Sequence, residues 1–123
     1  MVDSFLVAIG NYDLETVRPL FAPHANIGGV WLKEGVWRTT TYTFAQFDSL
    51  VTSRPDPTGY QEPVSHYTVH VEPGGLAFVR ADATLIKEGR ARSHNIDYFT
   101  LIKEEGAWRI LSASYVATPI EGE

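Results

Sequence analysis

The hydrophobic positions change their period along the chain. In the first third they recur every three to four residues, whereas after Tyr60 they mostly alternate with polar ones. The first period is typical of helices and the second of strands. Phe5, Leu6 and Ile9 share one helical face, and Gly10-Asn11 closes that segment. The pattern therefore predicts a helix at the start of the chain and strands over its second half.

A second helical segment begins after Asp13, whose side chain can cap it. Its apolar positions are Leu14, Val17, Leu20 and Phe21. Pro19 interrupts this segment, because proline removes a backbone hydrogen bond and clashes with the preceding turn. We expect a short or kinked helix that ends before Pro23.

Two strands and a third helix follow. Residues 25–33 and 36–41 are the predicted strands, joined by a tight turn at Glu34-Gly35. Thr43 and Gln46 form a capping-box pattern, in which hydroxyl and amide satisfy two free backbone donors. The helix they open carries Phe44, Phe47, Leu50 and Val51 on one face, and residues 54–59 are expected to form a loop.

From Tyr60 onward the chain predicts long strands separated by turn signals at residues 73–75, 88–89 and 104–106. One strand places Val79, Ala81, Ala83 and Leu85 on a mostly apolar face. The last strand alternates Leu111, Ala113 and Tyr115 with Ser112 and Ser114. Consecutive hairpins form an antiparallel sheet, and helices grouped at the front make the fold class α+β.

Composition agrees with one compact domain spanning residues 1–123. The chain is 44% hydrophobic and 20% charged, which is ordinary for a globular protein. It has no cysteine, so disulfides and thiolate chemistry are excluded, and we expect a cytoplasmic protein without a secretory signal. The net charge is −5, and the basic residues of the second half are interleaved with acidic ones. We therefore expect neither nucleic acid nor a membrane as a partner.

The order of these elements resembles the nuclear transport factor 2-like superfamily. The resemblance rests on residues 20–25 (Leu-Phe-Ala-Pro-His-Ala), 43–51, 96–103 and the Gly-Ala-Trp-Arg-Ile run at 106–110. The Asp-Tyr pair at 97–98 with that ending is most similar to the putative lumazine-binding branch. His24 departs from the pattern, because the superfamily usually has aspartate there. The resemblance implies a cone-shaped roll, in which a strongly bent sheet encloses a pocket with the N-terminal helices.

Asp97 is the first candidate for chemistry, because strands disfavour aspartate. By alternation it shares a face with Asn95 and Phe99. Resemblance to the more distant ketosteroid isomerase branch implies that Asp97 faces the cavity and donates a hydrogen bond to a substrate oxygen. That branch also has a general-base aspartate on its first strand, but residues 26–29 here are Asn-Ile-Gly-Gly. Asp97 could instead serve a structural role by bonding Asn95, a tyrosine or an arginine.

The predicted pocket combines Asp97 with residues from both helices and strands. Tyr115 is the second catalytic candidate, as a hydroxyl partner for Asp97. The ligand-binding candidates are Tyr12, Trp31, Phe47, Val79, Ala81, Ala83, Leu85, Asn95, Phe99, Leu111 and Ala113. Phe5 and Ile9 should close the other side. The alanines matter because small side chains leave room in a cavity, although large aromatic residues can equally be core residues.

The histidines do not form a metal-binding pattern. His66 and His70 would lie about 13 Å apart along a strand, too far to share one ion. With no cysteine and scattered carboxylates, we expect no metal and no cofactor. The sequence leaves open whether His24 or His66 approaches Asp97 as an acid–base pair.

Three functions remain open. The chain could bind a small, mainly apolar molecule, act as an isomerase, dehydratase or cyclase through Asp97, or serve as a dimerisation scaffold. The absence of a second carboxylate in the predicted pocket favours binding. We also expect a homodimer through the outer sheet face, because that face would otherwise expose a large apolar patch. The predicted outer residues are Ile86, Ile96, Tyr98, Ile102, Trp108 and Ile110.

Overall fold

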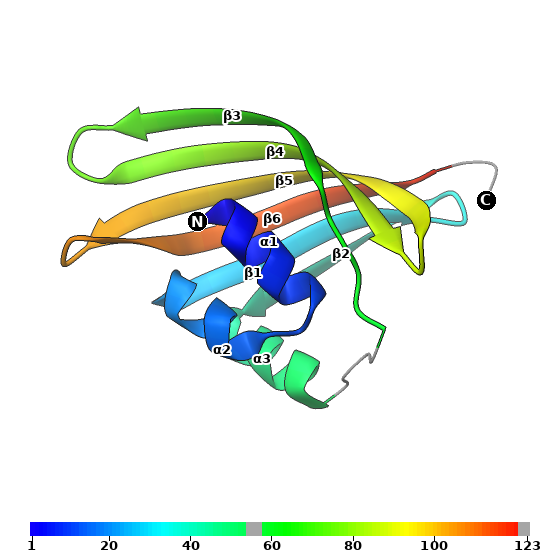
Figure 1. The fold of residues 1–123 in the computed structure, drawn as a ribbon, viewed down its shortest axis with the longest axis horizontal. Coiled ribbons are helices and arrows are strands. Elements are labelled where there is room, and N and C mark those ends of the chain that lie inside the picture. Colours follow the sequence, from blue (N-terminus) through cyan, green and yellow to red (C-terminus); the bar gives the residue numbers. More distant parts are fainter. Residues whose placement is uncertain (54–57, 121–123) are drawn as a thin grey trace.

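The computed structural model describes residues 1–53 and 58–120, and the predicted loop at 54–59 falls largely outside them. It contains a six-stranded sheet with helices gathered on one face (Figure 1). The strands are β1 (Phe21–Lys33), β2 (Val36–Thr43), β3 (Val64–Glu72), β4 (Leu76–Lys87), β5 (Arg90–Glu104) and β6 (Ala107–Pro119). The helices are α1 (Val2–Gly10), α2 (Leu14–Val17), the 3-10 turn η1 (Arg18–Leu20) and α3 (Phe44–Ser53). The predicted α+β class is confirmed.

The local signals act as the sequence predicts. The side chain of Asp13 accepts a hydrogen bond from the backbone N–H of Thr16 and caps α2. The 3-10 turn η1, which contains Pro19, follows directly. In the capping box of α3, the backbone N–H of Thr43 donates to Gln46 Oε1 at 2.9 Å, and that of Gln46 donates to Thr43 Oγ1 at 3.1 Å. The N-termini of α2 and α3 are thus both capped by short-range hydrogen bonds.

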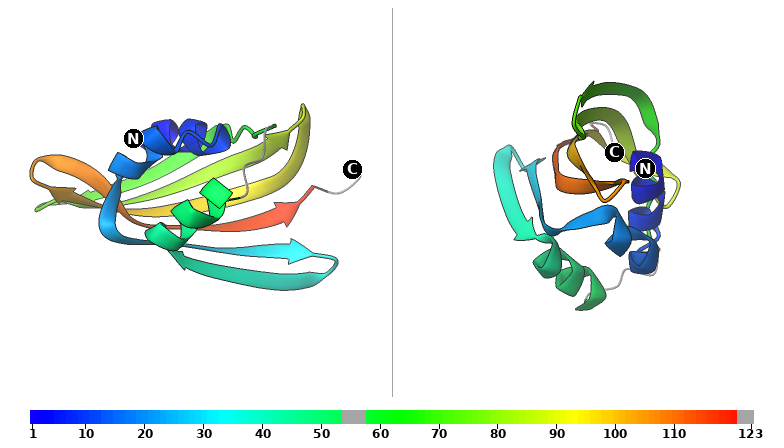
Figure 2. Two further views of the ribbon diagram at one scale, coloured as in Figure 1. Left: turned by 90° about the horizontal axis from the view of Figure 1, so that it is seen from below. Right: turned by 90° about the vertical axis from the view of Figure 1, so that its left-hand side faces the viewer.

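The strand order is β2-β1-β6-β5-β4-β3. Four of the five pairings are antiparallel, but β1 and β6 run parallel, so the predicted all-antiparallel sheet is corrected at one pairing. The parallel pair is where the β1–β2 hairpin joins the β3–β6 meander. Both views in Figure 2 show the sheet curling around the helices. None of the helices in the described segments is long and apolar enough to cross a bilayer.

Helix α1 lies on the concave face of the sheet and is anchored by aromatic contacts. The ring of Phe5 meets Phe21 of β1 edge-on at 5.4 Å between centroids and Phe99 of β5 at 5.7 Å. Each such pair is worth about 0.5–1.5 kcal/mol beyond its buried area. Phe5 therefore holds α1 across three neighbouring strands of the sheet.

A β-bulge changes the predicted faces of β6. Leu101 pairs with Ile110 and Thr100 with Ser112, so Leu111 has no partner in the ladder. The extra residue puts Ile110 on the helix side, where it is fully buried, and leaves Leu111 36% exposed. Leu111 was therefore wrongly predicted to face the cavity, and Ile110 wrongly predicted to face outward. Trp108 lies two residues before Ile110, on the same face, and packs against the core. Its predicted outward position is therefore wrong too.

Candidate functional site

A cavity of about 370 Å³ lies between the helices and the concave face of the sheet. This size is within the range of small-molecule pockets. Its wall includes ten of the residues that were predicted to face it: Phe5, Ile9, Trp31, Phe47, Leu85, Asn95, Asp97, Phe99, Ala113 and Tyr115. The wall is mostly apolar, and its polar side chains gather where β5, β6 and the segment before β3 meet.

Four other predicted residues lie close to the cavity without lining it. Tyr12 packs edge-on against Tyr60, with 6.1 Å between ring centroids. Val79 is buried in the core. Ala81 and Ala83 are also buried, because β3 lies beside them in the sheet. Ala81 and Ala83 therefore do not line the cavity, whereas Ala113, the third predicted alanine, does.

Asp97 is only 6% exposed and lies in the cavity wall. In the ladder it stands between Ala81 of β4 and Tyr115 of β6. Directly opposite residues share one face of a sheet, so Asp97 and Tyr115 point into the same space. The aspartate that strand propensity disfavours is thus held in place by neighbours on both sides.

Glu62 is a second carboxylate in the cavity wall, and the sequence analysis missed it. It precedes β3, in a segment that is tied to β4 by two hydrogen bonds of 2.8 Å between the backbones of Gln61 and Ile86. Gln61 is exposed, so by alternation the next side chain turns inward. Alternation carried back from Tyr67 would have turned Gln61 inward instead, because a bulge between Val64 and His66 reverses the faces of the strand. The inference that the pocket holds one lone acid is therefore wrong.

Glu62 and Asp97 form a carboxyl pair, joined by a side-chain hydrogen bond. Strand β4 lies between β5 and the segment that carries Glu62, and Ala81 is its residue opposite Asp97. One oxygen of each, Glu62 Oε2 and Asp97 Oδ2, is buried with no hydrogen-bond partner. The carboxyl pair thus joins β5 to the segment before β3.

The carboxyl pair holds a shared proton near neutral pH. Burial raises the pKa of Glu62 to about 9, and the hydrogen bond with Asp97 acts in the same direction. Burial also raises the pKa of Asp97, while its hydrogen bond with Glu62 lowers it. Two carboxyl groups in contact share a proton, so the pair titrates as one unit that holds this proton more tightly than a free carboxyl group does.

Asn95 holds Glu62 from the side. Ser93 Oγ donates to Asn95 Oδ1 at 2.7 Å, so the amide oxygen of Asn95 is already engaged. The amide N–H groups remain as donors, and a hydrogen bond from Asn95 lowers the pKa of Glu62 against the larger effects of burial and Asp97. Ser93 and Asn95 therefore orient the carboxyl pair.

Two tyrosines complete the polar end of the cavity. Burial is the main cause that raises the pKa of both the Tyr60 and Tyr115 hydroxyls, so they stay neutral donors. The Tyr115 ring lies on the backbone of Gly29, where an added Cβ would stand 2.2 Å from the ring. Gly29 is thus required for Tyr115 to reach the cavity.

The histidines lie elsewhere. All four are exposed, and neither His24 nor His66 lies in the cavity wall, so neither pairs with Asp97 there. Among residues 1–53 and 58–120, no three His, Asp or Glu side chains are placed to hold a metal ion. The titratable chemistry of the cavity rests on carboxyl and phenol groups.

The sequence profile of the family described as putative lumazine-binding matches residues 1–116. The chain belongs to this family. Comparison with curated proteins returns no match. The nuclear transport factor 2-like fold that the sequence resembles is confirmed by the family match and by solved structures.

Three solved structures illustrate the shared fold. A nuclear transport factor 2-like protein of unknown function from Shewanella baltica is 21% identical, with a TM-score of 0.66 over 97% of this chain and 89% of that one. A protein from Novosphingobium aromaticivorans, described as having a cystatin-like fold, is 16% identical, with a TM-score of 0.70 over 97% and 77%. The beta subunit of a putative aromatic-ring-hydroxylating dioxygenase from the same organism is 12% identical, with a TM-score of 0.73 over 95% and 84%. At these identities the likeness concerns the fold alone.

Proposed function

We propose that this protein binds a small, flat, mainly apolar molecule in the cavity. The body of the ligand lies between the aromatic and aliphatic walls, and its polar edge meets the carboxyl pair. The observation that carries the proposal is one polar cluster, built around Asp97, in the wall of an otherwise apolar cavity. Such a combination is typical of small-molecule sites, where a few polar groups fix the orientation of the ligand.

The family description supports a flat heterocycle as the first compound to test. Lumazine is a planar bicycle with a polar edge, and a cavity of about 370 Å³ has room for it. Trp31 and Phe47 lie in the wall and offer rings on which such a molecule can stack.

Titration with lumazine, followed by tryptophan fluorescence and calorimetry, tests this proposal. Ala113→Leu fills the cavity from β6 and should weaken binding at least tenfold. Ala107→Leu, at an exposed position of the same strand, is the matched control and should bind like the wild type. Equal binding by all three proteins would place the ligand outside this cavity and reject the proposal.

A second candidate function is acid–base catalysis of the isomerase, dehydratase or cyclase type. It is favoured by the carboxyl pair, because two carboxyl groups that share one proton can take a proton at one group and give one at the other. Asp97→Asn should then abolish turnover of a bound substrate while leaving its affinity within a few fold. A substrate that turns over equally in this variant would exclude the role.

We further propose a homodimer through the outer sheet face. Ile86 and Ile96 are half-buried there, and Tyr98 is 46% exposed. An apolar face of this kind is covered in many assemblies. Light scattering at tens of micromolar should give a dimer for the wild type and a monomer for Tyr98→Lys; a monomeric wild type would refute the proposal.

A further inference from the structure

We propose that the ligand of this cavity carries a basic nitrogen, of the amine, amidine or amino-heterocycle class, whose N–H groups bind Glu62 Oε2 and Asp97 Oδ2. This inference rests on the proposed binding function and names the chemical class of the ligand. It starts from the two carboxyl oxygens of the cavity wall, Glu62 Oε2 and Asp97 Oδ2, that are buried without a partner. Buried polar atoms normally have a hydrogen-bond partner, so these two oxygens are places for donors from outside the chain.

The free oxygens of the carboxyl pair are acceptors. The proton of the carboxyl pair is shared between Glu62 and Asp97. A carboxyl group that shares its proton still has free lone pairs, so Oε2 and Oδ2 can each accept a further hydrogen bond. Two neighbouring acceptors match two N–H donors on one ligand group, as in an amidinium.

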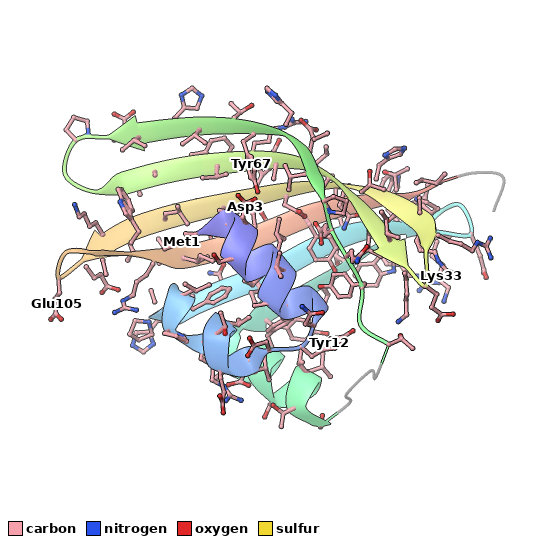
Figure 3. The ribbon with its side chains drawn as sticks, viewed as in Figure 1. Met1, Asp3, Tyr12, Lys33, Tyr67 and Glu105 are labelled. Atoms are coloured by element: carbon pink, nitrogen blue, oxygen red, sulfur yellow. The ribbon has the colours of Figure 1, made fainter. Side chains whose placement is uncertain are left out.

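The described wall of the cavity contains no Lys, Arg or His. A buried negative charge without a cation is costly, and the charge of the pair is buried, since Asp97 is only 6% exposed. The other titratable groups that face the pair are the phenols Tyr60 from the preceding segment, Tyr67 from β3 and Tyr115 from β6. None of them is cationic, and the hydroxyl of Tyr67 is engaged with Asp3 of α1 (Figure 3). A cationic ligand would supply the missing positive charge.

Binding of such a cation should release the shared proton. The free pair carries one negative charge, because one proton serves two carboxyl groups. An ammonium or amidinium placed on both groups favours the second ionisation, so the pair gains a second negative charge and the proton passes to the buffer. Uptake of a neutral ligand leaves the proton where it is.

Three naphthalene derivatives with the same apolar body test the inference: the 2-carboxamidine, the methyl ketone and the 2-carboxylate. We expect the amidine to bind at least tenfold more tightly than the ketone at pH 7, and the carboxylate more weakly than both. Calorimetry in two buffers of different ionisation enthalpy should show release of close to one proton with the amidine and none with the ketone.

The variants Asp97→Asn and Glu62→Gln provide the internal control, because each preserves shape and removes one of the two ionisable groups. In both, the preference for the amidine should fall below threefold while the affinity for the ketone is retained. If the ketone or carboxylate binds the wild type as tightly as the amidine, the inference is overturned and the proposed binding function stands. If neither lumazine nor any of the three binds, both are rejected.

Discussion

Replacing Glu62 with glutamine should change the pH dependence of stability in a defined direction. A carboxyl group whose pKa is raised on folding keeps its proton in the native state after the unfolded chain has lost it. The native state then binds more protons than the unfolded state, so the free energy of unfolding falls as pH rises from about 4.5 toward 9.

The size of this loss of stability follows from the raised pKa of Glu62. Each pH unit within that window removes up to about 1.4 kcal/mol, so three units, from pH 5 to pH 8, remove about 4 kcal/mol at the limit. Because Glu62 and Asp97 titrate as a pair and the cavity is partly open to water, we expect about 2–4 kcal/mol. This is a large part of the total stability of a small domain.

Urea unfolding at pH 5, 6.5 and 8 measures this loss of stability. The wild type should lose stability across this range, and Glu62→Gln should lose much less and be the more stable protein at pH 8. Other titrating groups, such as Asp48, whose hydrogen bond to Arg18 lowers its pKa, cancel in the difference between the two proteins. Glu72→Gln removes an exposed carboxylate and should follow the wild type. Parallel curves for wild type and Glu62→Gln would refute the buried carboxyl pair.

Three further predictions concern the supports of the site. Gly29→Ala should lower the free energy of unfolding in urea by about 1–3 kcal/mol and weaken lumazine binding, because the new Cβ collides with the Tyr115 ring. In a Tyr115→Ala background this cost should nearly vanish. An equal cost there would contradict the contact. Tyr67→Phe should cost about 1 kcal/mol by removing the hydrogen bond to Asp3, and an unchanged midpoint would show that this bond adds nothing. Thr43→Ala should cost about 1 kcal/mol through loss of the capping box, with Thr39→Ala, at an exposed position of β2, as the neutral control.

Much of the fold could be predicted from the sequence because its signals are local. The tight turns at Glu34-Gly35 and Glu88-Gly89 adopt positive φ at both residues, the geometry of two-residue hairpin loops. Alternation likewise indicated that Asp97 and Phe99 share a face, and both lie in the cavity wall. Periodicity works wherever a strand is regular.

The errors arose where long-range pairing decides the outcome. The alternation of β6 gives no sign of the bulge at Leu111, because the register against β5 creates it. Glu62 lies outside the regular part of β3, and its inward direction depends on the bridge between Gln61 and Ile86. The parallel pairing of β1 with β6 joins residues almost ninety positions apart, which no local pattern encodes.

The bulge at Leu111 also has a consequence for how this pocket can vary in size. Elsewhere in β6, loss of one residue would exchange the two faces of the strand. At Leu111 it would not: Ile110, Ser112 and Ala113 would then alternate regularly, with the first and last still facing inward. What the extra residue contributes is the bend, since a bulged strand curves more than a regular one. The volume available to a ligand is therefore governed in part by a residue that never touches it, and a deletion there would flatten the sheet while every wall residue of β6 kept its face.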